Sequence, residues 1–358
     1  MAYEAQVLSD SISERGDRLT TLEVTIPRIV LAEFNTHRVF SRNSASSRAI
    51  PTRKQLSMIM EHPVVPDIFG RNQPRMEPDL ERPLNQAEIS EASETWLQAR
   101  DDMMSRALQI YLGRTAFEAA CLHAGGLKLD GTDATPDRRD ILSKVIDELP
   151  KELDKDYADK IGVKIEQLLG VHKQYANRLL EPFMWHKVIV TATEWQNFFA
   201  LRANPAAQRE IKLPAEMMLK ALDDSEPGPG HSGAVNGIND IWHLPLIHKE
   251  DFELAEDIKR KGSVMDVLIK VAVGRCARVS YLTHDGVRDL EKDLELYHRL
   301  AKDGHMSPME HVARVMAPSE YNKSQWSGNF KGWHQHRKDI AHEENYAKVI
   351  AQNPGKTP

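Results

Sequence analysis

A run of basic and hydroxyl side chains near the start of the chain has the composition of an anion-binding site. The segment 36–48 reads THRVFSRNSASSR, in which His37 and Arg38 are followed by Ser46-Ser47-Arg48. Residues 34–60 contain five Lys or Arg and no Asp or Glu, although the formal net charge of the chain is -6. Guanidinium groups bind phosphate through paired N–H donors, and short hydroxyls bind it at close range. A solvated Arg/Ser loop would have the same composition, so the neighbouring segments must decide between the two.

A second segment, 171–211, carries two isolated arginines, Arg178 and Arg202. Arg202 follows an apolar ridge at 198–201, and an arginine beside such a ridge most often extends along the surface. Asn204-Pro205 has the pattern of an N-cap followed by proline at the first helical position, which predicts that one helix ends near Arg202 and another begins there. Side chains at such a junction can point into a cleft.

A third segment consists of 275–281, which reads RCARVSY, followed by 303–311, in which His305 and His311 lie near the carboxylate of Glu310. The six-residue separation of the histidines does not match the i, i+4 spacing of helical metal ligands, so we expect no metal site. The run Ser307-Pro308-x-Glu310 instead predicts a capping box, with the proline at the first helical position. Free N–H groups at a helix N-terminus can bind an anion.

Hydrophobic periodicity indicates the elements that position these segments. Alternation at 21–26 predicts a half-buried strand that ends at Pro27, and a short helix through Phe34 would then deliver His37. The Pro-rich and charged stretch 62–85 predicts irregular structure. An extended segment is expected near 311–316. Further helices are predicted at 91–122, 138–169, 265–281 and 287–301.

Composition excludes several classes of protein. The chain has 358 residues, 41% of them hydrophobic, which is enough for one large domain or two ordinary ones. It has no apolar run near the ~20 residues that span a bilayer, and its first ten residues lack a signal-peptide profile, so we expect a cytoplasmic protein without a membrane anchor. The pI near 6.2 and the 6% of aromatic residues argue against nucleic-acid binding. Cys121 and Cys276 are expected to be small core residues.

Taken together, the three segments resemble one family, the flavin-dependent thymidylate synthases, or ThyX. The family is marked by Arg-His-Arg, seven residues and then Ser-x-Arg, which 36–48 matches except that Thr36 replaces the first arginine. Its paired-helix motif is matched by Arg178 and by 197–211, which contains NFFALR and QREI. Its ARVSY and GHxSPxEH elements reappear at 277–281 and 304–311.

The order of the motifs differs from the family, which usually places ARVSY and GHxSPxEH first. The resemblance therefore implies a circularly permuted chain, and 330–337 (FKGWHQHR) echoes the approach to Arg-His-Arg. It implies an α+β fold with an antiparallel sheet and long helices. Residues 1–225 would form one ThyX-like portion with a helical insertion at about 60–169, 226–240 a linker, and 241–358 a second portion with the flavin-side motif. The two portions would make one intertwined catalytic domain.

The resemblance also implies an activity, the methylation of dUMP at C5 to give dTMP. Methylenetetrahydrofolate would donate the carbon and NADPH would reduce a bound FAD, in a homotetramer with flavin sites between subunits. Since no cysteine is positioned to attack the pyrimidine, activation would come from electrostatic stabilisation and from a cofactor that supplies hydride. The residues with implied roles are Ser46 and Arg202 for catalysis, Ser44, Ser46, Arg48, Arg178 and Arg202 for the nucleotide, and His37, Arg38, Asn197, His305, Ser307 and Glu310 for FAD.

Departures from the family pattern leave alternatives open. Thr36 stands for an arginine, Ser44 for a glutamate, and Thr191 and Thr193 occupy a region where an Asn/Arg pair is common. The pyrimidine could be dCMP, and the one-carbon unit could be released as hydroxymethyl. A non-catalytic nucleotide-binding homologue is the alternative from a different class.

Overall fold

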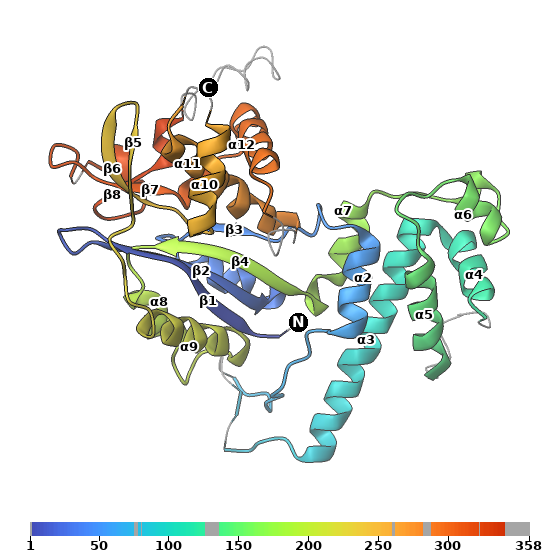
Figure 1. Ribbon diagram of the computed structural model, residues 1–358. Helices are drawn as coiled ribbons and strands as arrows, with labels where there is room; N and C mark the ends of the chain where they lie inside the picture. Colours follow the sequence, from blue (N-terminus) through green and yellow to red (C-terminus); the bar gives the residue numbers. More distant parts are fainter. Residues whose placement is uncertain are drawn as a thin grey trace, which may run out of the picture.

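The computed structural model describes residues 2–74, 78–79, 81–125, 136–259, 262–281, 288–321 and 323–340. These residues form a central antiparallel sheet, a helical body beside it, and a C-terminal body with a second antiparallel sheet (Figure 1). The predicted α+β class is confirmed.

The central sheet has the strand order β1-β2-β4-β3, and each pair of neighbours is antiparallel. Its strands are β1 (Glu4–Ile12), β2 (Arg18–Pro27), β3 (Ser41–Ser44) and β4 (Trp185–Ala192). The strand predicted at 21–26 is the middle of β2, and the short helix predicted after it is the 3-10 turn η1 (Arg28–Val30) followed by α1 (Leu31–Asn35). Helices α8 (Gln196–Arg202) and α9 (Arg209–Asp223) cover one face of the sheet (Figure 1) and share a hydrophobic core with it.

The opposite face of β2 is also buried, which corrects the prediction of a half-buried strand. Its polar residues Thr21, Glu23 and Thr25 are each at most 2% exposed. Glu23 Oε1 lies 2.9 Å from Lys187 Nζ on the neighbouring strand, and Thr21 Oγ1 lies 2.8 Å from His243 Nε2 in the C-terminal body. The predicted alternation of polar and apolar residues is present in β2, but the polar face is covered by residues such as His243, more than 200 positions away in the chain.

The C-terminal body contains a second sheet of order β5-β6-β7-β8, covered by helices. The strands are β5 (His231–Val235), β6 (Ile238–His243), β7 (Ala313–Val315) and β8 (Trp333–Gln335). The helices are α10 (Lys249–Ile258), α11 (Val264–Arg278), α12 (Leu290–Asp303) and the short α13 (Ser324–Ser327). The 3-10 turns are η4 (Val279–Tyr281), η5 (Ser307–Glu310) and η6 (His336–Asp339). The two helices and the extended segment predicted after residue 264 are confirmed.

The segment 226–240 was expected to be a linker, and most of it is a β-hairpin. β5 and β6 pair across Asn236-Gly237, whose φ angles are 52° and 80°. Asn-Gly with two positive φ angles is the favoured two-residue hairpin turn, because its twist matches that of the strands. Only 226–230 is an irregular connection, and Gly228 is hydrogen-bonded to β1 through Ile12 N at 2.8 Å.

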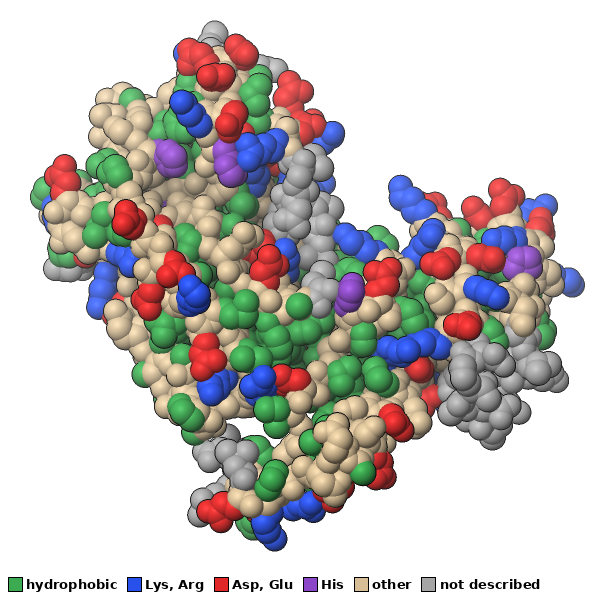
Figure 2. Space-filling model, turned by 60° about the horizontal axis from the view of Figure 1, so that its bottom comes forward, with side chains coloured by type: hydrophobic (Ala, Val, Ile, Leu, Met, Phe, Trp, Pro, Cys, Tyr) green, Lys and Arg blue, Asp and Glu red, His purple; other side chains and the backbone are tan. Residues whose placement is uncertain are grey.

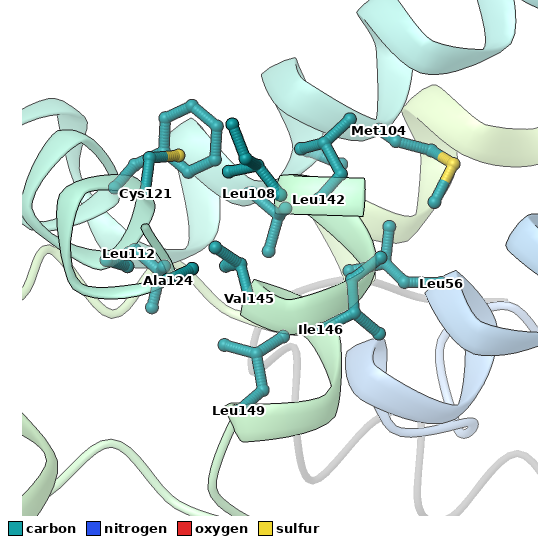
Figure 3. Close-up of a cluster of buried hydrophobic side chains, with 14 of the residues drawn as sticks. Leu56, Met104, Leu108, Leu112, Cys121, Ala124, Leu142, Val145, Ile146 and Leu149 are labelled. Atoms are coloured by element: carbon teal, nitrogen blue, oxygen red, sulfur yellow. The ribbon is translucent and has the colours of Figure 1, made fainter. Parts of the chain in front are cut away.

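The helical body packs around its own hydrophobic core, part of which is drawn in Figure 3. Its elements are α2 (Thr52–Glu61), α3 (Gln86–Leu112), α4 (Arg114–His123), α5 (Pro136–Glu148), α6 (Lys155–Lys160), η2 (Ile165–Gln167), α7 (Lys173–Ala176) and η3 (Asn177–Phe183). The helix predicted at 91–122 is broken at Gly113, whose φ is 94°. At this break Leu169 N donates to Leu112 O at 2.7 Å, so the segment around Leu169 satisfies a carbonyl at the C-terminal end of α3.

The helix predicted at 138–169 is likewise interrupted, because α5, α6 and η2 share this range. The irregular structure predicted at 62–85 is confirmed for the residues described there. Cys121 and Cys276 are both buried in the core as predicted, and neither is part of a disulfide.

Candidate functional site

The structure brings the first and third chemical segments into direct contact. Asn43 Nδ2 donates to Cys276 O at 2.7 Å across a separation of 233 positions in the chain. Ser46 N donates to Ser280 O at 3.0 Å. Strand β3 also packs against η5, so the Ser-x-Arg loop meets both the ARVSY and the GHxSPxEH segments.

A cavity of about 330 Å³ lies where β3 leaves the central sheet, and we call it the first lobe. Four arginines line it, and none of its described lining residues is an Asp or a Glu. The lining residues are Arg28, Leu31, Arg42, Asn43, Ser44, Ala45, Ser46, Ser47, Arg48, Arg178 and Ser307. This cluster of cations and hydroxyls matches the donor set that binds a phosphate.

A second cavity of about 550 Å³ adjoins the first, and we call it the second lobe. The lobes share Asn43, Ser46, Arg48 and Ser307. The remaining lining residues of the second lobe are Ala49, His172, Lys173, Ala277, Ser280, Tyr281, Leu300, His305 and Pro308. Again none of the described residues around it carries a carboxylate, and apolar side chains accompany the cations.

Among the described residues, cations line the two lobes without carboxylates, whereas other parts of the surface carry both signs of charge. The face in Figure 2 carries acidic and basic side chains interspersed, with hydrophobic side chains gathered towards its middle. Such a surface offers no long basic stripe on this side of the molecule, and the formal net charge of the chain is negative.

Glu181, in η3, orients two of the arginines of the first lobe. Its Oε1 atom lies 3.0 Å from Arg28 Nη2 and 3.2 Å from Arg178 Nη1, and it accepts from Ser47 Oγ at 3.0 Å. Burial, and then the charge of Arg28, lower the pKa of His186 to about 3, so this ring is neutral and accepts from Arg28 Nη1 at 3.0 Å. The single carboxylate of Glu181 therefore pairs with two guanidinium groups, and the four arginines leave the first lobe with net positive charge.

Arg42 is held by carbonyl groups. Its Nη1 donates to Phe34 O and to His37 O, each at 3.2 Å. Burial lowers its pKa, and the charge of Glu310 opposes that effect. These carbonyls orient the guanidinium without cancelling its charge, so Arg42 adds to the positive potential of the first lobe.

Six of the predicted site residues line the lobes. Ser44 and Arg178 lie in the first lobe, His305 in the second, and Ser46, Arg48 and Ser307 in both. Four lining residues are not among the predicted site residues, namely Arg28, Arg42, His172 and Lys173. For Arg42 the signal was the acid-free basic run, whereas the other three lie in segments whose contribution to the site depends on the tertiary fold.

The other predicted residues lie outside the lining of the lobes. Arg202 Nε donates to His37 Nε2 at 3.1 Å, and burial together with the charges of Arg202 and Arg42 lowers the pKa of His37. Arg38 and Asn197 are exposed near this pair. Among the hydrogen bonds of the described residues, the one from Arg42 to the His37 carbonyl links the His37–Arg202 pair to the first lobe.

Two local predictions at the site are wrong. Ser307–Glu310 is a 3-10 turn capped by Met306 without a side-chain bond, and Glu310 instead accepts from Arg337, so no capping box forms. The helix expected to start at Pro205 starts at Arg209, because Asn204 Oδ1 accepts from Ala206 N at 2.9 Å. A short amide side chain that closes such a turn competes with helix initiation.

A chain of buried side chains connects the central sheet to the C-terminal body beside the site. Thr191 Oγ1 lies 2.6 Å from Thr21 Oγ1 and 2.8 Å from His311 Nδ1, and Thr21 Oγ1 lies 2.8 Å from His243 Nε2. Burial lowers the pKa of both His243 and His311 to about 3. Thr191, noted as a departure from the family pattern, thus bonds directly to His311 of the GHxSPxEH segment, whose imidazole is neutral.

The described residues contain neither a cluster of side chains suited to a metal ion nor a helix suited to crossing a membrane. Within the described ranges, no group of three or more His, Cys, Asp or Glu side chains is arranged to hold a metal ion. None of the helices described is both long enough and apolar enough to cross a bilayer.

Comparison with known proteins identifies the family. No curated protein shows a significant match to the chain. The sequence model of the Thy1 family, described as thymidylate synthase complementing protein, matches residues 19–227, which is more than half of the 358 residues. The match includes the Ser-x-Arg loop and the segment with Arg178 and Arg202, and it ends before ARVSY and GHxSPxEH, so the permuted order stays a prediction. The chain belongs to the thymidylate synthase complementing protein family, Thy1, the ThyX family of the sequence resemblance.

Proposed function

We propose that this protein methylates dUMP at C5 to form dTMP, with methylenetetrahydrofolate as carbon donor, NADPH as reductant and FAD as bound cofactor. Family membership supports a thymidylate synthase type of function, and the choice of substrate and cofactors is the proposal. The observation that carries it is the first lobe, where four arginines converge without a lining carboxylate.

The first lobe would hold the nucleotide phosphate. Arg48 and Arg178 would bind it through charge-assisted hydrogen bonds, and Ser44 and Ser46 would add hydroxyl donors. Arg28 and Arg42 extend the set, because both line the same lobe and are fixed by Glu181 and by backbone carbonyls. A preorganised donor set of this kind binds an anion without first having to order its side chains.

The second lobe fits a flavin in its donor set. Ring systems bind in cavities with apolar walls and a few convergent polar groups, and here Leu300, Pro308 and Tyr281 accompany His305 and Ser307. When bound and reduced by NADPH, the flavin would supply the hydride that converts the transferred carbon unit to a methyl group. His305 and Ser307 would hold the cofactor, and Ser46, shared by both lobes, would lie beside both ligands.

Arg202, His37, Arg38 and Asn197 would complete the site from a neighbouring subunit. They gather around α8, outside the lining of the lobes, and Arg38 and Asn197 are exposed. In a homotetramer, these side chains would contact the flavin of the partner, and Arg202 would stabilise the anionic form of the pyrimidine ring.

The first test is the visible absorbance of the purified protein before and after addition of dUMP or dCMP, with the released cofactor identified. We expect an oxidised flavin spectrum that changes with dUMP, and dTMP as the product when methylenetetrahydrofolate and NADPH are added. A response to dCMP alone, or a hydroxymethylated product, would replace this reaction with C5 modification of another kind. A protein that cannot be reconstituted with FAD would leave only nucleotide binding.

A pair of variants tests the assigned roles. Arg48→Ala should raise the Kd for dUMP roughly tenfold or more, because one charge-assisted contact to the phosphate is lost. Arg202→Ala should abolish turnover even when dUMP is saturating. Arg106→Ala is the matched control, since Arg106 is exposed on α3 and its side chain donates to Gln109. Equal kinetic damage from both site variants, or none, would contradict these roles.

A further inference from the structure

The far side of the second lobe is built by the helical body, through His172 and Lys173. Neither residue belongs to the motifs that define the family resemblance, yet both line the same cavity as Ser46 and Arg48. We propose that Lys173, with His172, binds a second anionic group, distinct from the nucleotide phosphate and carried by the molecule that occupies the second lobe. This inference rests on the proposed function, in which the second lobe holds a cofactor or co-substrate.

Lys173 is held in place against the Ser-x-Arg loop. Its Nζ donates at 2.8 Å to the carbonyl oxygen of Ala49, the residue that follows Arg48 in the chain. The same short stretch of the helical body is anchored to the loop by Asn177, whose Nδ2 donates to Ser47 O at 2.8 Å and to Ile50 O at 3.0 Å. An ammonium group has three donors and a carbonyl engages one, so Lys173 has N–H capacity left for a ligand.

The distribution of charge between the lobes supports a second anion. Arg28, Arg42 and Arg178 line only the first lobe, and Arg48 is shared, which already exceeds what one phosphate monoester needs. Lys173 and His172 line only the second lobe, where none of the described lining residues is acidic. A carbonyl contact does not neutralise an ammonium group, and a ligand carboxylate or phosphate in the lobe would do so.

The size of the second lobe indicates what carries the anion. Its volume of about 550 Å³ lies within the range of pockets that enclose drug-sized molecules, and it has apolar walls. A lone phosphate ion would leave those walls uncovered. The occupant is therefore a ring system with an acidic arm. Two molecules of the proposed reaction have this chemistry: FAD, through its diphosphate, and a folate, through its glutamate carboxylates.

The experiment compares Lys173→Gln with wild-type protein in four binding measurements. These are the Kd for FAD from its absorbance change, the KM for mono- and triglutamyl methylenetetrahydrofolate, the Kd for dUMP, and the Kd for inorganic diphosphate from calorimetry. Loss of one charge-assisted contact should weaken binding of the anionic arm roughly tenfold and leave dUMP binding within about twofold. Lys173→Arg should restore much of the affinity, and Lys164→Gln, an exposed lysine of the same body that lies outside the lining, is the control.

The results separate the two sources of the anion. A change in the FAD Kd alone assigns the contact to the diphosphate. A KM that rises more for the triglutamyl than for the monoglutamyl substrate assigns it to the glutamate carboxylates. Unchanged binding of FAD, both folates and inorganic diphosphate would overturn the inference, and so would a loss of dUMP affinity as large as the loss for the other ligands.

Failure of the proposed reaction can be told apart from failure of this inference. If wild-type protein forms no dTMP but Lys173→Gln still loses diphosphate affinity, the reaction is wrong and the anion site stands. If wild-type protein forms dTMP and Lys173→Gln behaves as Lys164→Gln does, the reaction stands and the assignment of Lys173 is wrong.

Discussion

Acidification should destabilise the protein through buried neutral histidines, and His243 allows the effect to be measured at one site. Burial lowers the pKa of His243 to about 3, with a smaller opposing contribution from Asp10. In the unfolded chain the same ring has a pKa of about 6.5. Protons therefore bind more tightly to the unfolded chain, so the stability that this group contributes is complete above pH 6.5 and is lost as the pH falls towards 3.

The size of the effect follows from these two values. Between pH 7 and pH 5 the unfolded ring becomes almost fully protonated while the folded ring stays neutral, which lowers the free energy of unfolding by about 2 kcal/mol. Because pH 5 lies above the folded pKa, the unfolded pKa sets the magnitude. His186 and His311 have pKa values lowered to about 3 by the same cause, so the three rings together should cost about 6 kcal/mol over this interval.

Urea unfolding at pH 7 and pH 5, for wild type and His243→Gln, measures the contribution of this ring. Glutamine keeps a hydrogen-bonding group near Thr21 and Ser11 but does not titrate. The variant will be less stable at pH 7, and the difference from wild type should shrink by about 2 kcal/mol at pH 5. His62→Gln, at an exposed position, should show no such change. A His243→Gln difference that is the same at both pH values would refute the reasoning.

Three further predictions concern stability, each measured by urea or thermal unfolding. Arg275→Met should lower the free energy of unfolding by about 3–5 kcal/mol, because it removes the cation that lies 2.7 Å from the buried carboxylate of Asp251, whereas Asp293 keeps its ion pair with Arg278 at 2.6 Å; a loss below 1 kcal/mol would mean that the contact with Asp251 is not maintained in solution. Leu108→Ala should cost about 2–5 kcal/mol through a cavity in the core of Figure 3, where Leu108 is 0% exposed; a near-neutral variant would contradict the packing of that core. Gly113→Ala should lower Tm, because its φ is 94° and an added Cβ would lie 3.0 Å from Gln167 O; an unchanged Tm would contradict the conformation of this turn.

Elements with strong local periodicity could be predicted from the sequence. Strand β2 and helices α11 and α12 each carry the pattern of their class, and the structure has them at the expected places. The β5–β6 hairpin was missed, because its Gly- and Pro-rich context favoured a linker over the Asn236-Gly237 hairpin signal. Burial of the polar face of β2 could not be predicted locally, since the covering layer belongs to the C-terminal body.

Some residues of the site could likewise be predicted from the sequence, and others could not. Ser46, Arg48 and Arg178 stand in recognisable patterns, and the structure gathers them in one cavity. Arg28 and Lys173 have no pattern of their own, because what makes them part of the cavity is the packing of distant segments. Lys173 in particular reaches the site through a bond to a carbonyl 124 positions earlier in the chain.

Because the C-terminal body meets the central sheet mainly through side-chain contacts, the site does not depend on which of the two comes first in the sequence. Among the described residues, the two sheets remain separate, and side chains make most of the joint between them: Thr21 with His243, Thr191 with His311, and Asn43 with a backbone carbonyl. Complementary surfaces make these contacts whichever surface is synthesised first. The chain termini can therefore move to other loops during evolution. The condition is that the two surfaces stay on one chain, or are present at concentrations high enough to associate.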